Sequence, residues 1–185
     1  MFNKFCLIFT LILLSYSNLV YSNPKNTIGE DQNTVNILNN YFSKQTMVGK
    51  ANFQFLFWNM YDAKLISESG SYPSNKFALI LKYNKDFSKK SVVDETINQL
   101  KKQKTFKEKE LKEVNTLLNK AFREIKKNNK FVGIKNNDKA IFYFQNEKVL
   151  ETDNSEFIKI FFDIWLRENS QNPKFTQELL GKTRG

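Results

Sequence analysis

Few side chains in this sequence could carry catalysis. The chain has no histidine, and its single cysteine, Cys6, lies in an apolar N-terminal segment. These absences exclude a cysteine or histidine nucleophile system, an ordinary zinc site and an internal disulfide. Any general base must therefore be Asp, Glu, Lys or Tyr. We expect no metal site and no cofactor.

The neighbouring acids Asp94 and Glu95 do not form a convincing acid–base pair. Adjacent residues of a helix point in different directions, so their carboxylates would not face each other. Near the start of a helix, their charges would instead compensate the helix dipole. The chain also has no glycine-rich loop of the kind that cradles phosphate. The sequence therefore nominates no catalytic residue.

Positive charge is concentrated in the middle of the chain. The formal net charge is +10, and the segment from Lys82 to Lys135 holds fifteen lysines and one arginine against seven acids, a net +9. One interpretation is a pair of lysine-rich helices whose charged faces are simply solvated. The other is a surface for an anionic membrane or an acidic ligand. We do not expect nucleic acid as a partner, because the N-terminus predicts export.

Residues 1–22 have the three-part pattern of a secretory signal peptide. A lysine precedes a nearly continuous apolar run from Phe5 to Leu14, and Val20-Tyr21-Ser22 offers a cleavage site. The run is shorter than the ~20 residues of a spanning helix. Cys6 lies at the beginning of the run and not at its end, which argues against lipoprotein processing. We expect cleavage near Ser22 and a periplasmic or secreted protein.

The remaining chain has the length of one domain. Residues 23–36 are polar and include Pro24 and Gly29, so we predict a flexible leader there. Residues 37–185 are long enough for a single hydrophobic core, and we expect one domain.

The stretch from Phe53 to Leu65 is unusually apolar. Eight of its thirteen residues are Phe, Leu, Trp, Met or Tyr, which favours a strand buried on both faces. The alternation places Phe53, Phe55 and Phe57 on one face, and we expect these three rings to be buried together. Further strands are predicted at Phe77–Tyr83, Phe131–Ile134 and Ala140–Phe144, the last continuing through a hairpin into residues 148–152.

Between and after these strands, apolar residues recur every three or four positions, as in amphipathic helices. Two such segments occupy residues 87–103 and 111–125, a third follows a cap at Asn154 or Ser155, and a short fourth begins at Pro173. This order predicts an α+β fold: an antiparallel sheet of about six strands with helices packed on one face. A second layer would cover the other face of a central strand.

Three stretches resemble a known family: VGKANFQFLFWNMYDAKL, FALILKYNKDFSKKSVVDETINQLKKQ and FFDIWLRENSQNPKFTQELLG. In their order and spacing, the chain is similar to the exported bacterial chalcone isomerase-like proteins from about Ile37 to the C-terminus. The resemblance implies an antiparallel sheet covered by helices. It also relates the chain to plant isomerases, which close a flavanone ring, and to plastid fatty-acid-binding proteins without isomerase activity.

The resemblance also implies where the isomerase residues would fall. Lys44 matches an arginine that binds an anionic oxygen, Leu56 matches a threonine, and Phe87 matches a tyrosine. A lysine keeps the charge but loses the bidentate fork, and the other two positions lack a hydroxyl. Losing such polar groups costs orders of magnitude in rate. We therefore expect no flavanone-forming isomerisation.

The residues and the resemblance together favour a binding protein. We expect a small apolar or fatty-acid-like ligand in a cleft between sheet and helices, near Gln54, Leu56, Trp58 and Phe87, with Lys44 holding an anionic head group. Two alternatives stay open. One is an isomerase of the intramolecular lyase type, and the other is an envelope structural protein that uses its basic helices to bind a partner.

Overall fold

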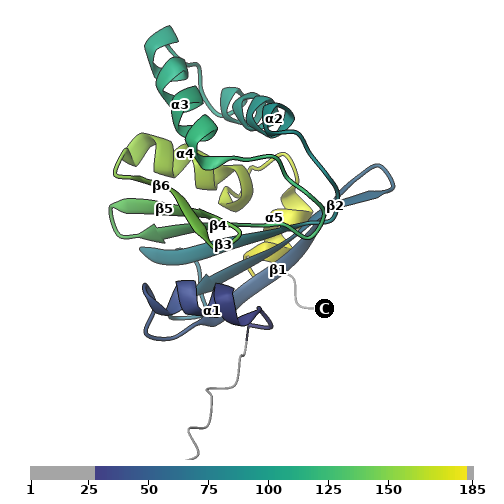
Figure 1. The fold of residues 1–185 in the computed structure, drawn as a ribbon, viewed down its shortest axis with the longest axis vertical. Coiled ribbons are helices and arrows are strands. Elements are labelled where there is room, and N and C mark those ends of the chain that lie inside the picture. Colours follow the sequence, from purple (N-terminus) through teal and green to yellow (C-terminus); the bar gives the residue numbers. More distant parts are fainter. Residues whose placement is uncertain (1–27, 183–185) are drawn as a thin grey trace, which may run out of the picture.

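A computed structural model describes residues 28–182, in which a six-stranded antiparallel sheet lies between two layers of helix (Figure 1). The strands lie in chain order, so each pairs with the next. They are β1 (Thr46–Phe55), β2 (Trp58–Ser67), β3 (Lys76–Tyr83), β4 (Lys130–Asn136), β5 (Lys139–Phe144) and β6 (Glu147–Thr152). The helices are α1 (Gln32–Asn39), α2 (Lys89–Lys101), α3 (Glu108–Ala121), α4 (Ser155–Leu166) and α5 (Pro173–Leu179). The predicted α+β fold is confirmed. The predicted signal peptide, residues 1–22, lies outside the described residues.

The central strand β3 is buried on both faces because each face has its own hydrophobic layer. Leu79 and Leu81 point to the larger core beneath α2, α3, α4 and α5. Ala78 and Ile80 point to a smaller core beneath α1. A strand covered on both sides reads as a continuous apolar run, which is why the segment FALILKY was recognisable in the sequence.

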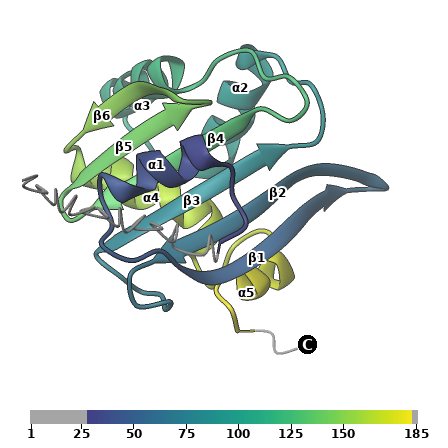
Figure 2. The same ribbon diagram turned by 60° about the horizontal axis from the view of Figure 1, so that its bottom comes forward.

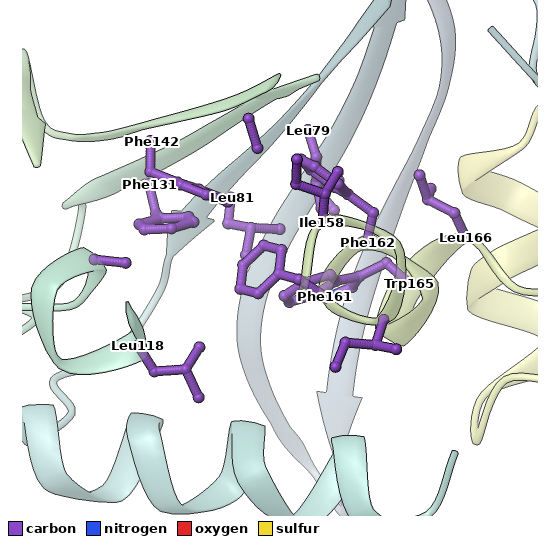
Figure 3. Close-up of a cluster of buried hydrophobic side chains, with 14 of the residues drawn as sticks. Leu79, Leu81, Leu118, Phe131, Phe142, Ile158, Phe161, Phe162, Trp165 and Leu166 are labelled. Atoms are coloured by element: carbon purple, nitrogen blue, oxygen red, sulfur yellow. The ribbon is translucent and has the colours of Figure 1, made fainter. Parts of the chain in front are cut away.

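Helix α4 supplies much of the larger core, and its aromatic side chains project onto the sheet (Figure 3). The Asn154 side chain caps the helix by accepting a hydrogen bond from the Phe157 backbone N–H at 2.9 Å. One turn further on, the Phe161 ring packs edge-on against Phe142 of β5, with ring centroids 5.0 Å apart. The helical stripe predicted for this segment is therefore the stripe that the protein buries.

The N-terminal part of the described chain corrects one prediction. Residues 23–36 were predicted as a flexible leader. Residues 23–27 lie outside the described residues, but within the rest Ile28 is only 2 % exposed and α1 begins at Gln32. The Asp31 side chain caps α1 by accepting from the Thr34 backbone N–H at 3.0 Å. Helix α1 lies across the sheet face opposite α4 (Figure 2). The sequence prediction missed this helix because only Ile37 and Leu38, with Thr34, are buried along its eight residues.

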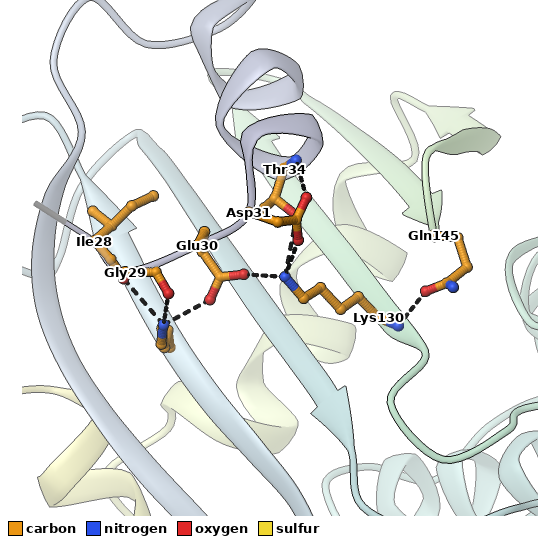
Figure 4. A network of polar contacts seen from close by, with 8 residues as sticks. Ile28, Gly29, Glu30, Asp31, Thr34, Lys130 and Gln145 are labelled. Atoms are coloured by element: carbon orange, nitrogen blue, oxygen red, sulfur yellow. Dashed lines mark hydrogen bonds and ion pairs between the residues drawn. The ribbon is translucent and has the colours of Figure 1, made fainter. Parts of the chain in front are cut away.

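A network of charged groups ties the segment before α1 to the sheet (Figure 4). Lys64 of β2 donates to the carbonyls of Ile28 and Gly29, each at 3.0 Å, and pairs with Glu30 at 2.7 Å. Lys130 of β4 pairs with both Glu30 and Asp31. The Glu30 side chain is almost fully buried between the two lysines. The negative charges of Glu30 and Asp31 are thus compensated by lysines where the chain enters the fold.

The stretch from Phe53 to Leu65 is a hairpin and not the single strand predicted. β1 ends at Phe55, Leu56 and Phe57 form the turn, and β2 begins at Trp58. The expected joint burial of the three phenylalanines is also wrong, because Phe55 is 60 % and Phe57 is 99 % exposed. Sequence reasoning missed the turn because it contains none of the Gly, Asn, Asp or Pro residues that mark two-residue hairpins.

Helix α5 approaches β1 backbone to backbone. A Cβ atom at Gly49 would come within 2.8 Å of the Gly181 nitrogen and closer still to the carbonyl oxygens of Glu178 and Leu179. Only glycine fits between these backbones. Gly181 itself closes the helix with a φ of 67°. This contact fixes α5 against the edge of the sheet, next to the cavity described below.

Candidate ligand-binding cavity

A partly open cavity of about 400 Å³ lies between the sheet and the helices of the larger core. Its floor comes from β1, β2 and β3, and its walls come from α2, α4 and α5 with the segment that joins the last two. The volume falls within the ~300–1,000 Å³ range of small-molecule sites. Apolar and aromatic side chains provide most of the lining.

A row of three aromatic residues crosses the floor of the cavity. Phe53 on β1 is paired in register with Tyr61 on β2, and Tyr61 is paired with Tyr83 on β3. Directly opposed residues of adjacent strands point to the same face, so the three rings stand side by side. The Phe53 and Tyr61 rings stack at 4.9 Å, and the Tyr61 and Tyr83 rings meet edge to face at 6.0 Å. Phe87 continues the row, 5.7 Å from Tyr83.

The two tyrosine hydroxyls differ in their hydrogen bonding. The Tyr61 oxygen accepts from the Trp165 indole N–H at 3.0 Å, which leaves its own proton to be donated elsewhere. Tyr83 is only 5 % exposed, and its hydroxyl has no hydrogen-bond partner in residues 28–182. The oxygen is nevertheless not sealed off from solvent. Tyr83 is also one of the residues that line the cavity.

The same burial keeps both hydroxyls protonated. Burial raises the pKa of Tyr83 above its ordinary range, and the neighbouring Tyr61 adds to the shift. Burial also raises the pKa of Tyr61, although the hydrogen bond from Trp165 opposes that shift. Groups held in this state donate hydrogen bonds and are poor bases. The pair can therefore hold a carbonyl or carboxyl oxygen of a ligand.

A buried hydroxyl pair joins the two C-terminal helices at the wall of the cavity. Ser170 and Thr176 share a hydrogen bond of 2.6 Å, and the Thr176 hydroxyl lies 2.9 Å from the carbonyl oxygen of Trp165, to which it donates. Thr176 is 1 % exposed. These bonds place Trp165 and Phe175 against the cavity and hold α5 to α4.

Charge is scarce around the cavity. Of the described residues that line it, Glu95 alone carries a charge, and its carboxylate accepts from the Gln99 amide at 2.6 Å. Glu95 is solvent-exposed, so it lies at the rim. No lysine or arginine among the described lining residues could pair with an anionic head group. The described lining also includes uncharged polar residues: Ser91, Thr96, Gln99, Ser170, Gln171, Asn172 and Thr176. The hydroxyls of Thr96, Ser170 and Thr176 are already bonded within the protein.

Only one of the five residues predicted for the site lines the cavity, and that residue is Phe87. Lys44 is exposed in the loop between α1 and β1. Gln54, Leu56 and Trp58 lie at the exposed end of the β1–β2 hairpin. Contact of these four residues with a ligand stays a prediction, and their location outside the cavity lining does not favour it. Sequence reasoning passed over Tyr61, Tyr83 and Trp165. The available signal was a tyrosine hydroxyl within each of two apolar strands.

The lysine-rich segment forms much of α2 and α3, and few of its charges are neutralised. Lys90 pairs with Asp94 within α2 at 2.5 Å, and Lys104 pairs with Glu110 at 3.4 Å and also with Glu156. Between residues 28 and 182, no helix is long and apolar enough to cross a bilayer. Across the same residues, no three His, Cys, Asp or Glu side chains gather as metal ligands would.

Comparisons with known proteins bear on the fold. No family model matches the sequence, and no curated protein matches it. Among solved structures, the chain is similar to an Arabidopsis thaliana fatty-acid binding protein, with a TM-score of 0.57 and 13 % sequence identity. The match covers 75 % of this chain and 88 % of that one. At this identity the likeness concerns the fold alone, and it agrees with the chalcone isomerase-like architecture expected from the sequence.

Proposed function

We propose that this protein binds a fatty-acid-like ligand, with its apolar chain in the aromatic cavity and its head-group oxygen on Tyr83 and Tyr61. The observation that carries the proposal is the unpaired Tyr83 hydroxyl inside an apolar cavity. A hydroxyl without a protein partner is free to donate its hydrogen bond to a ligand oxygen. The structural likeness to a fatty-acid binding protein supports the same class of ligand.

The proposed head group differs from the one expected from the sequence alone. Lys44 was assigned an anionic head group, but it lies outside the cavity lining. Two neutral phenols hold an uncharged oxygen better than a carboxylate, because no cation offsets the loss of water around a buried charge. The site therefore favours a protonated acid, an ester or an amide over a free carboxylate.

The apolar lining predicts a dependence on chain length. Each buried CH₂ group contributes ~0.8 kcal/mol, or about fourfold in affinity. Affinity should therefore rise along a series of saturated chains until the cavity is full. Beyond that length it should level off, because additional methylene groups would remain in water.

Calorimetric titration tests the proposal with a saturated fatty acid and its methyl ester. We expect both to bind, and the affinity of the acid to rise by up to several hundredfold as the pH falls from about 8 towards 5, because the protonated fraction of a carboxyl that titrates near pH ~4 to 5 rises by about that factor. The affinity of the ester should not change over this range. Tyr83→Phe should weaken both ligands about five- to tenfold, and Lys44→Ala should leave them unchanged.

Tyr143→Phe is the matched control, because Tyr143 lies on the opposite face of the sheet, where its hydroxyl bonds to Tyr41 at 2.8 Å. Equal ligand affinities for the native protein and Tyr83→Phe would contradict the proposal that Tyr83 binds the head-group oxygen. If added fatty acids of every chain length leave the melting temperature unchanged, the protein does not bind this class of ligand. The alternative of a structural partner protein would then remain.

Export remains part of the proposal. It depends on residues 1–22, whose pattern predicts a cleaved signal peptide. Mass spectrometry of protein recovered from the producing cells should find an N-terminus near Asn23. Intact Met1 in the cytosolic fraction would contradict export without affecting the cavity.

A further inference from the structure

The tip of the β1–β2 hairpin is the most apolar exposed surface of the described residues. Phe55, Leu56, Phe57 and Trp58 are 60 %, 74 %, 99 % and 58 % exposed, and no other large hydrophobic side chain between residues 28 and 182 is exposed. The hairpin extends beyond the rest of the sheet in both ribbon views (Figures 1 and 2). Four consecutive exposed apolar side chains form a contiguous patch. Such patches mark interaction sites, whereas single exposed apolar residues are common on protein surfaces.

The geometry of the turn does not account for these residues. Phe55 pairs with Trp58, so Leu56 and Phe57 form a two-residue turn. Leu56 has a φ of 54°, whereas Phe57 has no positive φ. A turn with a positive φ at its first position strongly favours glycine there, and a leucine is strained in that conformation. Leucine at this position makes the turn less stable and the tip more apolar.

Polar and basic groups surround the base of the hairpin. Lys85 lies over the Trp58 ring, with its ammonium nitrogen 3.2 Å from the ring centroid. The Asn59 side chain accepts from Asn52 at 2.7 Å and from Asn84 at 2.8 Å, which braces the base against the end of β3. Asp86, next to Lys85, pairs with Lys126 at 3.1 Å. Asn52 and Asn84 also donate to the Asp62 carboxylate. An apolar tip thus projects from a braced base, with Lys85 beside it.

We infer that the hairpin tip inserts into the interfacial region of an anionic lipid bilayer. Tryptophan and phenylalanine are favoured at the boundary between head groups and acyl chains, and nearby lysines are attracted to anionic head groups. The tip projects from the sheet, and Lys85 together with the chain's formal net charge of +10 complements a negatively charged membrane surface. These features favour a bilayer over a second copy of this chain, whose matching surface would carry the same positive charge.

Membrane contact at the tip would also bring the cavity close to the source of an apolar ligand. Phe53 lies two residues before Phe55, and Met60 lies two residues after Trp58. Both line the cavity, so the two strands of the hairpin run from the tip into the cavity floor. The membrane inference does not depend on the proposed ligand, because the tip can bind vesicles while the cavity is empty.

Vesicle co-sedimentation tests the inference, with vesicles of phosphatidylcholine alone and of equal parts phosphatidylcholine and phosphatidylglycerol. Purified protein with and without residues 1–22 should be compared, so that the N-terminal apolar run is accounted for. We expect binding to the anionic vesicles. The affinity of the double variant Leu56→Gly, Phe57→Ser for these vesicles should be lower by at least about tenfold. This variant should fold at least as well as the native protein, because glycine and serine suit this turn.

Further variants separate the contributions. Lys85→Ala should weaken binding to anionic vesicles and reduce its sensitivity to salt. Trp58→Phe should keep most of the binding but abolish the blue shift of tryptophan fluorescence that vesicles cause in the native protein. Fatty-acid titration of the double variant should be unchanged, which keeps this test separate from that of the cavity.

Three results would overturn the inference. One is a native protein that does not bind anionic vesicles. Another is a double variant that binds as well as the native protein, which would assign any membrane contact to the lysine-rich helices. The third is a native dimer that the double variant converts to a monomer, since the tip would then be covered by a second copy of the chain.

Discussion

Tyr61 and Tyr83 stand directly opposite each other on β2 and β3, with ring centroids 6.0 Å apart at the floor of the cavity. Their hydroxyls face different surroundings: one is bonded to Trp165, whereas the other has no partner between residues 28 and 182. Cross-strand pairing thus produces a site with one oriented hydroxyl and one free donor. The predictions below test this arrangement and the contacts that hold it in place.

Replacing the unpaired hydroxyl should not destabilise the protein. Tyr83→Phe keeps the ring and its packing but removes a hydroxyl without a protein partner, so the free energy of unfolding should stay the same or rise by up to ~1 kcal/mol. Tyr143→Phe makes the same chemical change where the hydroxyl bonds to Tyr41 at 2.8 Å, and it should lower that free energy by ~1 kcal/mol. Urea denaturation of both variants measures the sign of each change in the free energy of unfolding. A loss of stability in Tyr83→Phe would mean that its hydroxyl is already satisfied.

The hydroxyl bridge between α4 and α5 should contribute to both stability and binding. Thr176→Val keeps the shape of the side chain but leaves the Trp165 carbonyl and the Ser170 hydroxyl without their partner, at a cost of ~1–3 kcal/mol. Ligand affinity should fall as well, because Trp165 and Phe175 line the cavity.

Thr116→Val is the matched control for this bridge. Thr116 is exposed on α3 and its hydroxyl bonds only within its own helix, to the Lys112 carbonyl at 2.9 Å. Its stability should change by less than ~0.5 kcal/mol. Equal thermal denaturation midpoints for the two valine variants would show that the buried bridge does not stabilise the protein.

The charged cluster beside α1 should make stability depend on acid pH. Burial alone would raise the pKa of Asp31, but hydrogen bonds from Lys130 and Thr34 outweigh this and lower the pKa to about 2. A carboxyl with a lowered pKa in the folded state stabilises the protein above its unfolded pKa of ~3.9, and this contribution is lost as the pH falls towards 2.

Asp31→Asn removes this titration while keeping a good helix cap. The melting temperature of the variant should therefore fall less between about pH 4 and pH 2 than that of the native protein. The difference should be small, because the Asp31 side chain is 51 % exposed and its ion pair is screened by solvent. An unchanged pH profile would mean that Asp31 is not coupled to Lys130 in solution.

We expect no flavanone-forming isomerisation. Phe87 lines the cavity without a hydroxyl, and Leu56 and Lys44 lie outside the cavity lining. The two tyrosines that line the cavity have raised pKa values, so their hydroxyls do not ionise readily near neutral pH. A chalcone absorbance assay should show no loss of substrate above the rate without protein. Turnover that disappears in Tyr83→Phe would contradict this expectation and make the cavity an active site.

Local patterns in the sequence determined several elements correctly. The run from Phe77 to Tyr83 identified β3 because both faces of that strand are covered. The stripe through Phe157, Phe161, Ile164 and Trp165, after a cap predicted at Asn154 or Ser155, identified α4. Both signals arise within one segment, from side-chain periodicity and from a hydrogen bond between neighbours, so they can be read without knowing what the segment packs against.

The tertiary structure alone decided the hairpin and the cavity. The turn at Leu56 has no favourable turn residue, and it is imposed by the pairing of the strands on either side of it. The row of Phe53, Tyr61 and Tyr83 depends on the register of three strands, and a shift by one residue would point each ring to the other face. The placement of Trp165 beside Tyr61 joins positions 104 residues apart. Such relationships depend on long-range packing, which no local periodicity encodes.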